Sequence, residues 1–306
     1  MRFQAISVGI EVPTSYFSGT VHSVFRQACN LSIEPHKLLT LLPSEEGNVP
    51  QGIRLNASSQ LAFLDLLRVG QPVACRGGIL RIDGVLSIDL RNADLWHIDL
   101  TALPIDLRRP DHMLSWAAAW FELRASHHTI GLPEIMHAVS FPGEQCGSSV
   151  VPSAALEWST RTIPALLRAI RDLRLDDAMT AIGSVIGRGS GLTPSGDDFL
   201  VGYLAGLWCG TESSPPRVRF LTALGSELFQ AARRTNDISC AYLRSAAEGH
   251  VSEPLATLAQ QLYRGDNLVL LRTAAQAALH IGHTSGTDGV LGLLLGCLAW
   301  QNPPPH

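Results

Sequence analysis

The 306-residue chain is poor in lysine, and its charges do not favour a polyanionic partner. Lys37 is the single lysine. Lysine and arginine together number 23 against 27 aspartate and glutamate residues, which gives a formal net charge of −4 at pH 7. Because general nucleic-acid binding requires a basic face, this balance argues against a nucleic-acid partner. It also means that arginine, histidine or backbone N–H groups must meet any bound anion.

Long apolar runs and paired cysteines are also missing. The uncharged runs reach roughly a dozen residues, too few to cross a bilayer, and the first residues lead into no apolar segment of the signal-peptide type. The six cysteines show no C-x-x-C spacing, so we expect reduced core thiols and neither disulfides nor a zinc site: Cys29, Cys75, Cys146, Cys209, Cys240 and Cys297. We therefore expect a cytoplasmic protein with no membrane partner.

The pattern of apolar residues changes near residue 108. Before that point, short alternating segments are separated by turn residues, and residues 79–90 are interrupted by Asp83-Gly84, a strong hairpin signal. Beyond it, apolar residues recur at helical spacing, as in residues 113–125. The sequence therefore predicts an α+β protein, with a β-rich N-terminal domain over residues 1–108 and a helical C-terminal domain over residues 109–306.

A glycine-rich, hydroxyl-bearing loop occupies residues 187–198 and ends in Asp197 and Asp198. An uncharged run, residues 199–209, follows at once. A loop that leads into a buried helix favours anion binding, because the first N–H groups of a helix are unpaired and its dipole is positive there. The glycine spacing does not fit a dinucleotide fingerprint, which also needs a preceding strand, and no Gly-Lys-Ser/Thr follows for a P-loop.

A second stretch repeats the first at an offset of 90 residues, which makes an internal pseudo-repeat in the helical domain. Residues 285–296 share the pattern Ser-Gly-x-Asp-x-x-x-Gly-x-x-x-Gly with residues 195–206, with six identities in twelve positions. The Ser-x-x-Asp spacing fits a capping box, and glycines four apart would let two helices approach closely. The repeat therefore predicts two helices that begin at these two segments and lie close together.

Three carboxylates are candidate catalytic residues: Asp197, Asp198 and Asp288. They could form an oxygen-rich magnesium site, and Mg²⁺ is the one candidate cofactor. Alternatively, Asp198 and Asp288 cap their helices while nearby hydroxyl and N–H groups bind the substrate. Asp197 has no counterpart in the second copy, where Thr287 stands, so it is the better candidate for chemistry.

Substrate binding is assigned to the donors around these carboxylates. Arg234 lies at a polar break between two predicted helices, and a guanidinium binds carboxylate or phosphate well. A triad of Ser195, His283 and Asp198 is not favoured, because no Gly-x-Ser-x-Gly turn supports it. The full set of candidate binding residues is Gly189, Gly191, Thr193, Ser195, Gly196, Arg234, Thr235, Ser239, Ser285 and Gly286.

Residues 191–200, Gly-Leu-Thr-Pro-Ser-Gly-Asp-Asp-Phe-Leu, resemble the hallmark of a bacterial family. That family includes the AllH-like subunit of oxamate carbamoyltransferase, from anaerobic allantoin degradation. The later blocks at Arg234-Thr235, Ile238-Ser239 with Tyr242-Leu243, and Thr284-Ser285-Gly286 with Asp288 are similar to it, as are residues 84–96. The resemblance spans most of the chain, with departures at Arg188, Ser190 and Thr287 that bear on the substrate.

The resemblance implies a subunit that works with two larger partner subunits to exchange a carbamoyl group between phosphate and oxamate or a similar amide. Carbamoyl phosphate and oxamate are small anions, and donors fixed at helix N-termini would position them. Two other functions remain open. One is a magnesium-dependent helical hydrolase that uses the three aspartates as ligands. The other is a non-catalytic scaffolding subunit whose glycines only pack helices.

Overall fold

The computed structural model describes the chain except residues 35–36, 59, 127–160, 190, 212–213 and 302–306. It forms two compact units, one made of Met1–Ile98 with His250–Glu253, and the other of Asp99–Gly249 with Pro254–His306. The first unit is β-rich and the second is helical, which confirms the α+β class. Five cysteines are free and buried, while Cys146 and Ser190 lie outside the described residues.

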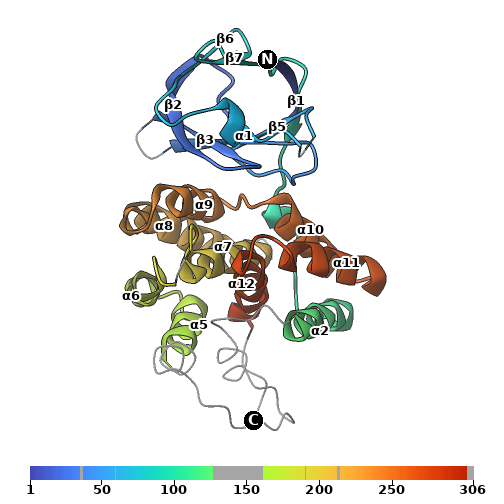
Figure 1. Cartoon of the computed structure of the whole chain (residues 1–306). Coiled ribbons are helices and arrows are strands. Elements are labelled where there is room, and N and C mark those ends of the chain that lie inside the picture. The colour runs from blue at the N-terminus through green and yellow to red at the C-terminus, as the bar shows by residue number, and fades with distance from the viewer. Residues whose placement is uncertain (35–36, 59, 127–160, 190, 212–213, 302–306) are drawn as a thin grey trace. The chain divides into compact units, whose positions relative to one another are not determined.

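The N-terminal unit is a β-sheet that closes into a barrel. The strands follow the order β5-β4-β3-β2-β6-β7-β8-β1-β9, and β5 also pairs with β1, which makes the ring drawn in Figure 1. The predicted hairpin is present, because β7 and β8 pair antiparallel on either side of Asp83 and Gly84. The strands are β1 (Arg2–Gly9), β2 (Phe17–Val24), β3 (Cys29–Glu34), β4 (Lys37–Leu42), β5 (Gly52–Leu55), β6 (Pro72–Arg76), β7 (Ile79–Ile82), β8 (Leu86–Asp89) and β9 (Asp94–Trp96), and one short helix, α1 (Phe63–Leu66), accompanies them.

Apolar side chains from alternate strand positions form the core of this unit. In β6 and β7 the buried residues alternate with exposed ones, as a sheet with one covered face requires. Leu31, Leu39, Ile53, Leu80 and Ile88 are fully buried in this cluster. The period of two in the sequence therefore reports the inner face of the barrel.

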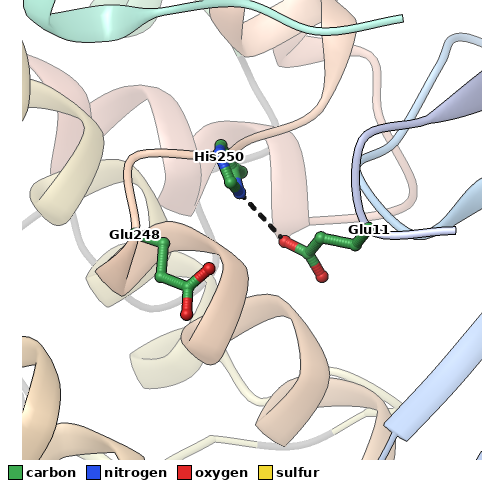
Figure 2. Close-up of side chains that lie close together, drawn as sticks. All are labelled: Glu11, Glu248 and His250. Carbon is green, nitrogen blue, oxygen red and sulfur yellow. Dashed lines mark hydrogen bonds and ion pairs between the residues drawn. The ribbon is translucent and has the colours of Figure 1, made fainter. Parts of the chain in front are cut away.

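The segment His250–Glu253 belongs to the barrel unit although it lies far downstream in the chain. Figure 2 shows the contact between His250 Nδ1 and Glu11 Oε1, which are 3.2 Å apart. Glu253 Oε2 accepts hydrogen bonds from the backbone N–H and the side-chain amide of Asn48, at 2.8 and 2.7 Å. The barrel is therefore completed by residues that follow several helices in the sequence.

The second unit is a bundle of helices in which α7 and α12 lie side by side at the centre (Figure 1). Nearly every residue of these two helices is buried. None of the described helices combines the length and the apolar character that a membrane span requires. The elements are η1 (Leu100–Ala102), α2 (Pro110–Ala125), α5 (Ile163–Arg171), α6 (Leu175–Val185), α7 (Ser195–Cys209), α8 (Pro215–Ala231), η3 (Ala232–Arg234), α9 (Asp237–Ala247), α10 (Glu253–Arg264), α11 (Leu268–Leu279) and α12 (Ser285–Ala299).

Four glycines hold α7 and α12 in backbone contact. A Cβ added at Gly202 would overlap the carbonyl oxygen of Gly289, and one at Gly292 would overlap that of Phe199. The second glycine of each helix, Gly206 or Gly296, meets the other helix in the same way. This packing confirms the prediction that the two repeated segments begin helices that lie together. It brings the two N-termini, with their positive dipole ends, to one place.

Candidate functional site

The loop before α7 folds back over the start of that helix. The carbonyl of Arg188 accepts a hydrogen bond from the N–H of Gly196 at 2.8 Å. Gly189 and Gly191 have φ values of 110° and 114°, a backbone conformation that side chains other than glycine rarely adopt. A Cβ at Gly189 would also lie 2.7 Å from the backbone nitrogen of Ser195. These two glycines therefore shape the loop, whether or not they touch a ligand.

The predicted capping boxes are wrong. The residues at the N-cap positions are Pro194 and Thr284, and neither makes a side-chain capping bond, so Ser195 and Ser285 are the first helical residues. A residue in that position can turn its hydroxyl away from its own helix. The two serine hydroxyls instead interact with carboxyl groups on the opposite helix.

The interactions between the helices form a crossed pattern. The Ser285 hydroxyl of α12 lowers the pKa of Asp198 of α7, and the Ser195 hydroxyl of α7 lowers that of Asp288 of α12. Thr193 adds two contacts, since its Oγ1 lies 2.9 Å from Asp198 Oδ2 and 2.9 Å from Ser285 Oγ. The pseudo-repeat in the sequence thus becomes an approximately symmetric cluster of hydroxyl and carboxyl groups.

Both carboxyl groups of this cluster have a raised pKa. Burial raises the pKa of Asp198 from 3.8 to about 6 and that of Asp288 to about 7, because desolvation penalises the charged form. The hydroxyl bonds lower both values, and a neighbouring carboxylate raises each. Asp288 is only 2% exposed, and its Oδ2 has no hydrogen-bond partner among the described residues. At neutral pH this pair therefore carries less than its full negative charge.

Asp197 stands apart from the other two carboxyls. It is 1% exposed, and its oxygens accept hydrogen bonds from the N–H of Gly187 at 2.7 Å and from Thr235 Oγ1 at 2.5 Å. These bonds join the loop, the start of α7 and the segment before α9. The geometry favours a structural role for Asp197, the reverse of the role that the repeat suggested. The three aspartates do not share these hydrogen-bond partners, so nothing in this arrangement favours a three-carboxylate magnesium site.

The other candidate binding residues fall into two groups. Thr193, Ser195 and Ser285 meet at the carboxyl pair, whereas Arg234 is exposed on η3 and Ser239 is buried in the first turn of α9. Gly196 and Gly286 are buried, and a Cβ at Gly286 would overlap the carbonyl of Ala278 on α11. For these two glycines, tight packing is sufficient to explain the residue type.

Two residues near the site were not among the candidate site residues predicted from the sequence. Asn236 caps α9, with its Oδ1 accepting from the N–H groups of Ile238 and Ser239, and its Nδ2 donates to the carbonyl of Leu192 at 2.9 Å. The signal was present, because asparagine before a helix is a common N-cap. Burial, and then the charge of Asp198, raises the pKa of Tyr242 to about 12, which places this phenol beside the cluster. Tyr242 lies three residues after Ser239, on the adjacent turn of α9.

Family comparison covers both units of the chain. Residues 4–95 match the model of the AllH family N-terminal domain, and residues 185–297 match that of the oxamate carbamoyltransferase subunit AllH. The second match contains the loop, the starts of α7, α9 and α12, and every residue of the carboxyl cluster. No solved structure matches the chain. The chain belongs to the AllH family of oxamate carbamoyltransferase subunits.

Proposed function

We propose that this chain contributes a substrate-binding surface to a carbamoyltransferase of purine-nitrogen (allantoin) catabolism. The reaction exchanges a carbamoyl group between phosphate and oxamate or a similar amide. The observation that carries the proposal is the meeting of two helix N-termini, with Ser195, Ser285 and Thr193 grouped around a pair of partly neutral carboxyls. A family of oxamate carbamoyltransferase subunits supports the substrate class. The free thiols fit a reducing compartment, so we place the protein in the cytoplasm.

The chemistry needs positioning more than a nucleophile from the protein. The oxamate nitrogen attacks the carbamoyl carbon, a C–N bond forms, the C–O bond to phosphate breaks, and the nitrogen loses a proton. Both substrates are anions, and negative charge shifts to the departing phosphate. Hydroxyl and backbone N–H donors at helix starts can hold such groups and stabilise the transition state. A scaffold with tightly packed glycines would not need this carboxyl pair, so we favour a binding role.

The proposal includes partner subunits. The described part of the site offers no strongly activated nucleophile, and the sequence contains neither nucleotide-binding motif. We infer that partner subunits supply the remainder of the pocket. The isolated chain should therefore fold and bind a small anion weakly at residues 187–198, yet catalyse little or no transfer.

Reconstitution tests this proposal. Carbamoyl transfer between carbamoyl phosphate and oxamate is measured for the isolated chain, for the partner subunits, and for the assembled complex. Replacing Ser195 and Ser285 together by alanine should lower the rate of the complex by roughly 10- to 1,000-fold, the range seen for lost transition-state donors. Ser226→Ala on α8 is the matched control, because within the described residues its hydroxyl donates to the carbonyl of Thr222 on its own helix. Rapid transfer by the isolated chain would contradict the need for partners, and full activity of the double variant would place the site elsewhere.

A further inference from the structure

The two carboxyls at the starts of α7 and α12 receive few hydrogen bonds. Thr193 Oγ1 lies 2.9 Å from Asp198 Oδ2 and 2.9 Å from Ser285 Oγ, and the two hydroxyl protons are sufficient for these two contacts. Neither contact reaches Asp288, which is 2% exposed. On the other side, Asp288 Oδ2 is buried without a partner among the described residues, where a protonated oxygen could donate to a bound group.

The surroundings do not neutralise the pair with a cation. Within the described part of the chain, no salt bridge joins Asp198 or Asp288 to arginine or histidine, and Lys37 is in the other unit. The ionisable groups that interact with Asp198 or Asp288 are Asp197 of α7 and Tyr242 of α9. Among the described residues, helices α2, α5, α6, α8 and α11 contribute no further ionisable group to this interaction. Neither of these two neighbours can offset a negative charge.

A fully ionised pair would repel the anions that the two helix N-termini attract. In a partly buried site such repulsion is screened less by solvent and salt than it would be at an exposed surface. The same location can bind an anion only if the carboxyls lose charge. Building on the proposed function, we propose that the Asp198–Asp288 pair holds a proton while an anion is bound at the starts of α7 and α12, so that anion binding and proton uptake are linked.

Calorimetric titration of the full-length chain with oxamate and with sulfate tests this linkage. Both probes keep their charge between about pH 5 and about pH 9, so any pH dependence comes from the protein. Titrations in buffers of different ionisation enthalpy count the protons bound. The expected result is uptake of up to about one proton per anion near neutral pH, and an affinity that falls by up to about tenfold per pH unit above pH 7.

Asparagine variants identify the groups responsible. Asp198→Asn combined with Asp288→Asn should abolish proton uptake and leave an affinity that varies little with pH. Asp176→Asn, in the exposed first turn of α6, makes the same change at another helix start and should behave as the unaltered chain. If the double variant fails to fold, the proton count of the unaltered chain and that of Asp288→Asn alone still decide the matter.

Each other outcome has a distinct meaning. Binding that is lost in the Ser195→Ala, Ser285→Ala variant but takes up no proton would overturn this inference and leave the proposed function standing. An affinity that rises with pH when MgCl₂ is present, and not with EDTA, would mean that a divalent cation neutralises the pair, and would also overturn it. If neither anion binds at any pH, the proposed function itself fails.

Discussion

Asp197 and Asp198 are adjacent in the sequence, but their carboxyl groups contact different partners. The carboxylate of Asp197 holds the N–H of Gly187 and the hydroxyl of Thr235 in a buried place. Asp197→Ala would leave both donors unpaired, so we expect the free energy of unfolding to fall by about 2–4 kcal/mol, measured by urea denaturation. Asp176→Ala, an exposed helix-start residue, is the control and should change stability by less than about 1 kcal/mol. A stable Asp197→Ala variant that has lost only ligand affinity would instead restore the role that the repeat suggested.

Asp288 should make the protein less stable as the pH rises. Its pKa of about 7 lies above its ordinary value of 3.8, so the folded chain binds more protons than the unfolded chain between those values. The free energy of unfolding therefore falls as the pH rises from about 4 to about 7. Asp288→Asn removes this dependence.

We expect Asp288→Asn to be more stable than the unaltered chain by roughly 1–4 kcal/mol above pH 7, and to match it near pH 4. Urea denaturation at both pH values measures the difference. A variant that is less stable at both values would contradict the raised pKa.

At the scale of helices, the contact between α7 and α12 depends on glycine. A Cβ at Gly206 would overlap the carbonyl of Leu293 and lie 2.8 Å from the Cα of Gly296, and neither backbone can move independently of its helix. Gly206→Ala should therefore lower the free energy of unfolding by about 2–4 kcal/mol, as overpacked cores do. It should also weaken anion binding, because the two helix starts would separate.

Gly183→Ala on α6 is the matched control for Gly206→Ala. Its Cβ would meet only the end of the Arg234 side chain, at 3.3 Å, and alanine favours a helix over glycine by about 0.8–1 kcal/mol. This variant should keep or gain stability in the same urea experiment. Equal losses in both variants would mean that helix propensity, and not the contact between α7 and α12, sets the result.

The repeat predicted which helices meet, and could not predict how their side chains pair. Matching glycines at a spacing of four identify two faces that pack closely, and this geometry is local to each helix. The direction of the Ser195 and Ser285 hydroxyls depends instead on where the opposite carboxyl lies. Each serine was expected to be the N-cap but is the first residue of its helix, so its hydroxyl faces the opposite helix and does not cap its own. The hydrogen bond of Asp197 to Thr235 could not be predicted for the same reason, since Thr235 is a partner from another segment.

At the scale of the whole molecule, the α+β class could be predicted because the spacing of apolar residues changes from a strand pattern to a helix pattern. The closure of the barrel could not be predicted from that spacing. The hairpin in residues 79–90 could be predicted, because Asp83-Gly84 and the alternating residues on either side of it are neighbours in the sequence. Strand β1 pairs with β5 and with β8, which are distant from it in the sequence. The local pattern of apolar residues cannot predict such pairings. The domain boundary at residue 108 stays a prediction. A barrel cut there would lack His250–Glu253.

Glu253 should stabilise the barrel although it follows α9 in the chain. Its Oε2 accepts two hydrogen bonds from Asn48, which is 7% exposed, and Glu253→Ala removes both of them. Glu253→Ala should therefore lower the free energy of unfolding by about 1–3 kcal/mol. Hydrogen exchange should speed up at Asn48 and in β5, which begins four residues later.

Glu227→Ala, exposed on α8, should leave exchange in the barrel unchanged. If the Asn48 amide of Glu253→Ala exchanges as slowly as in the unaltered chain, the barrel does not depend on the downstream segment. A fragment ending at residue 108 would then be expected to fold as stably as the barrel of the full chain.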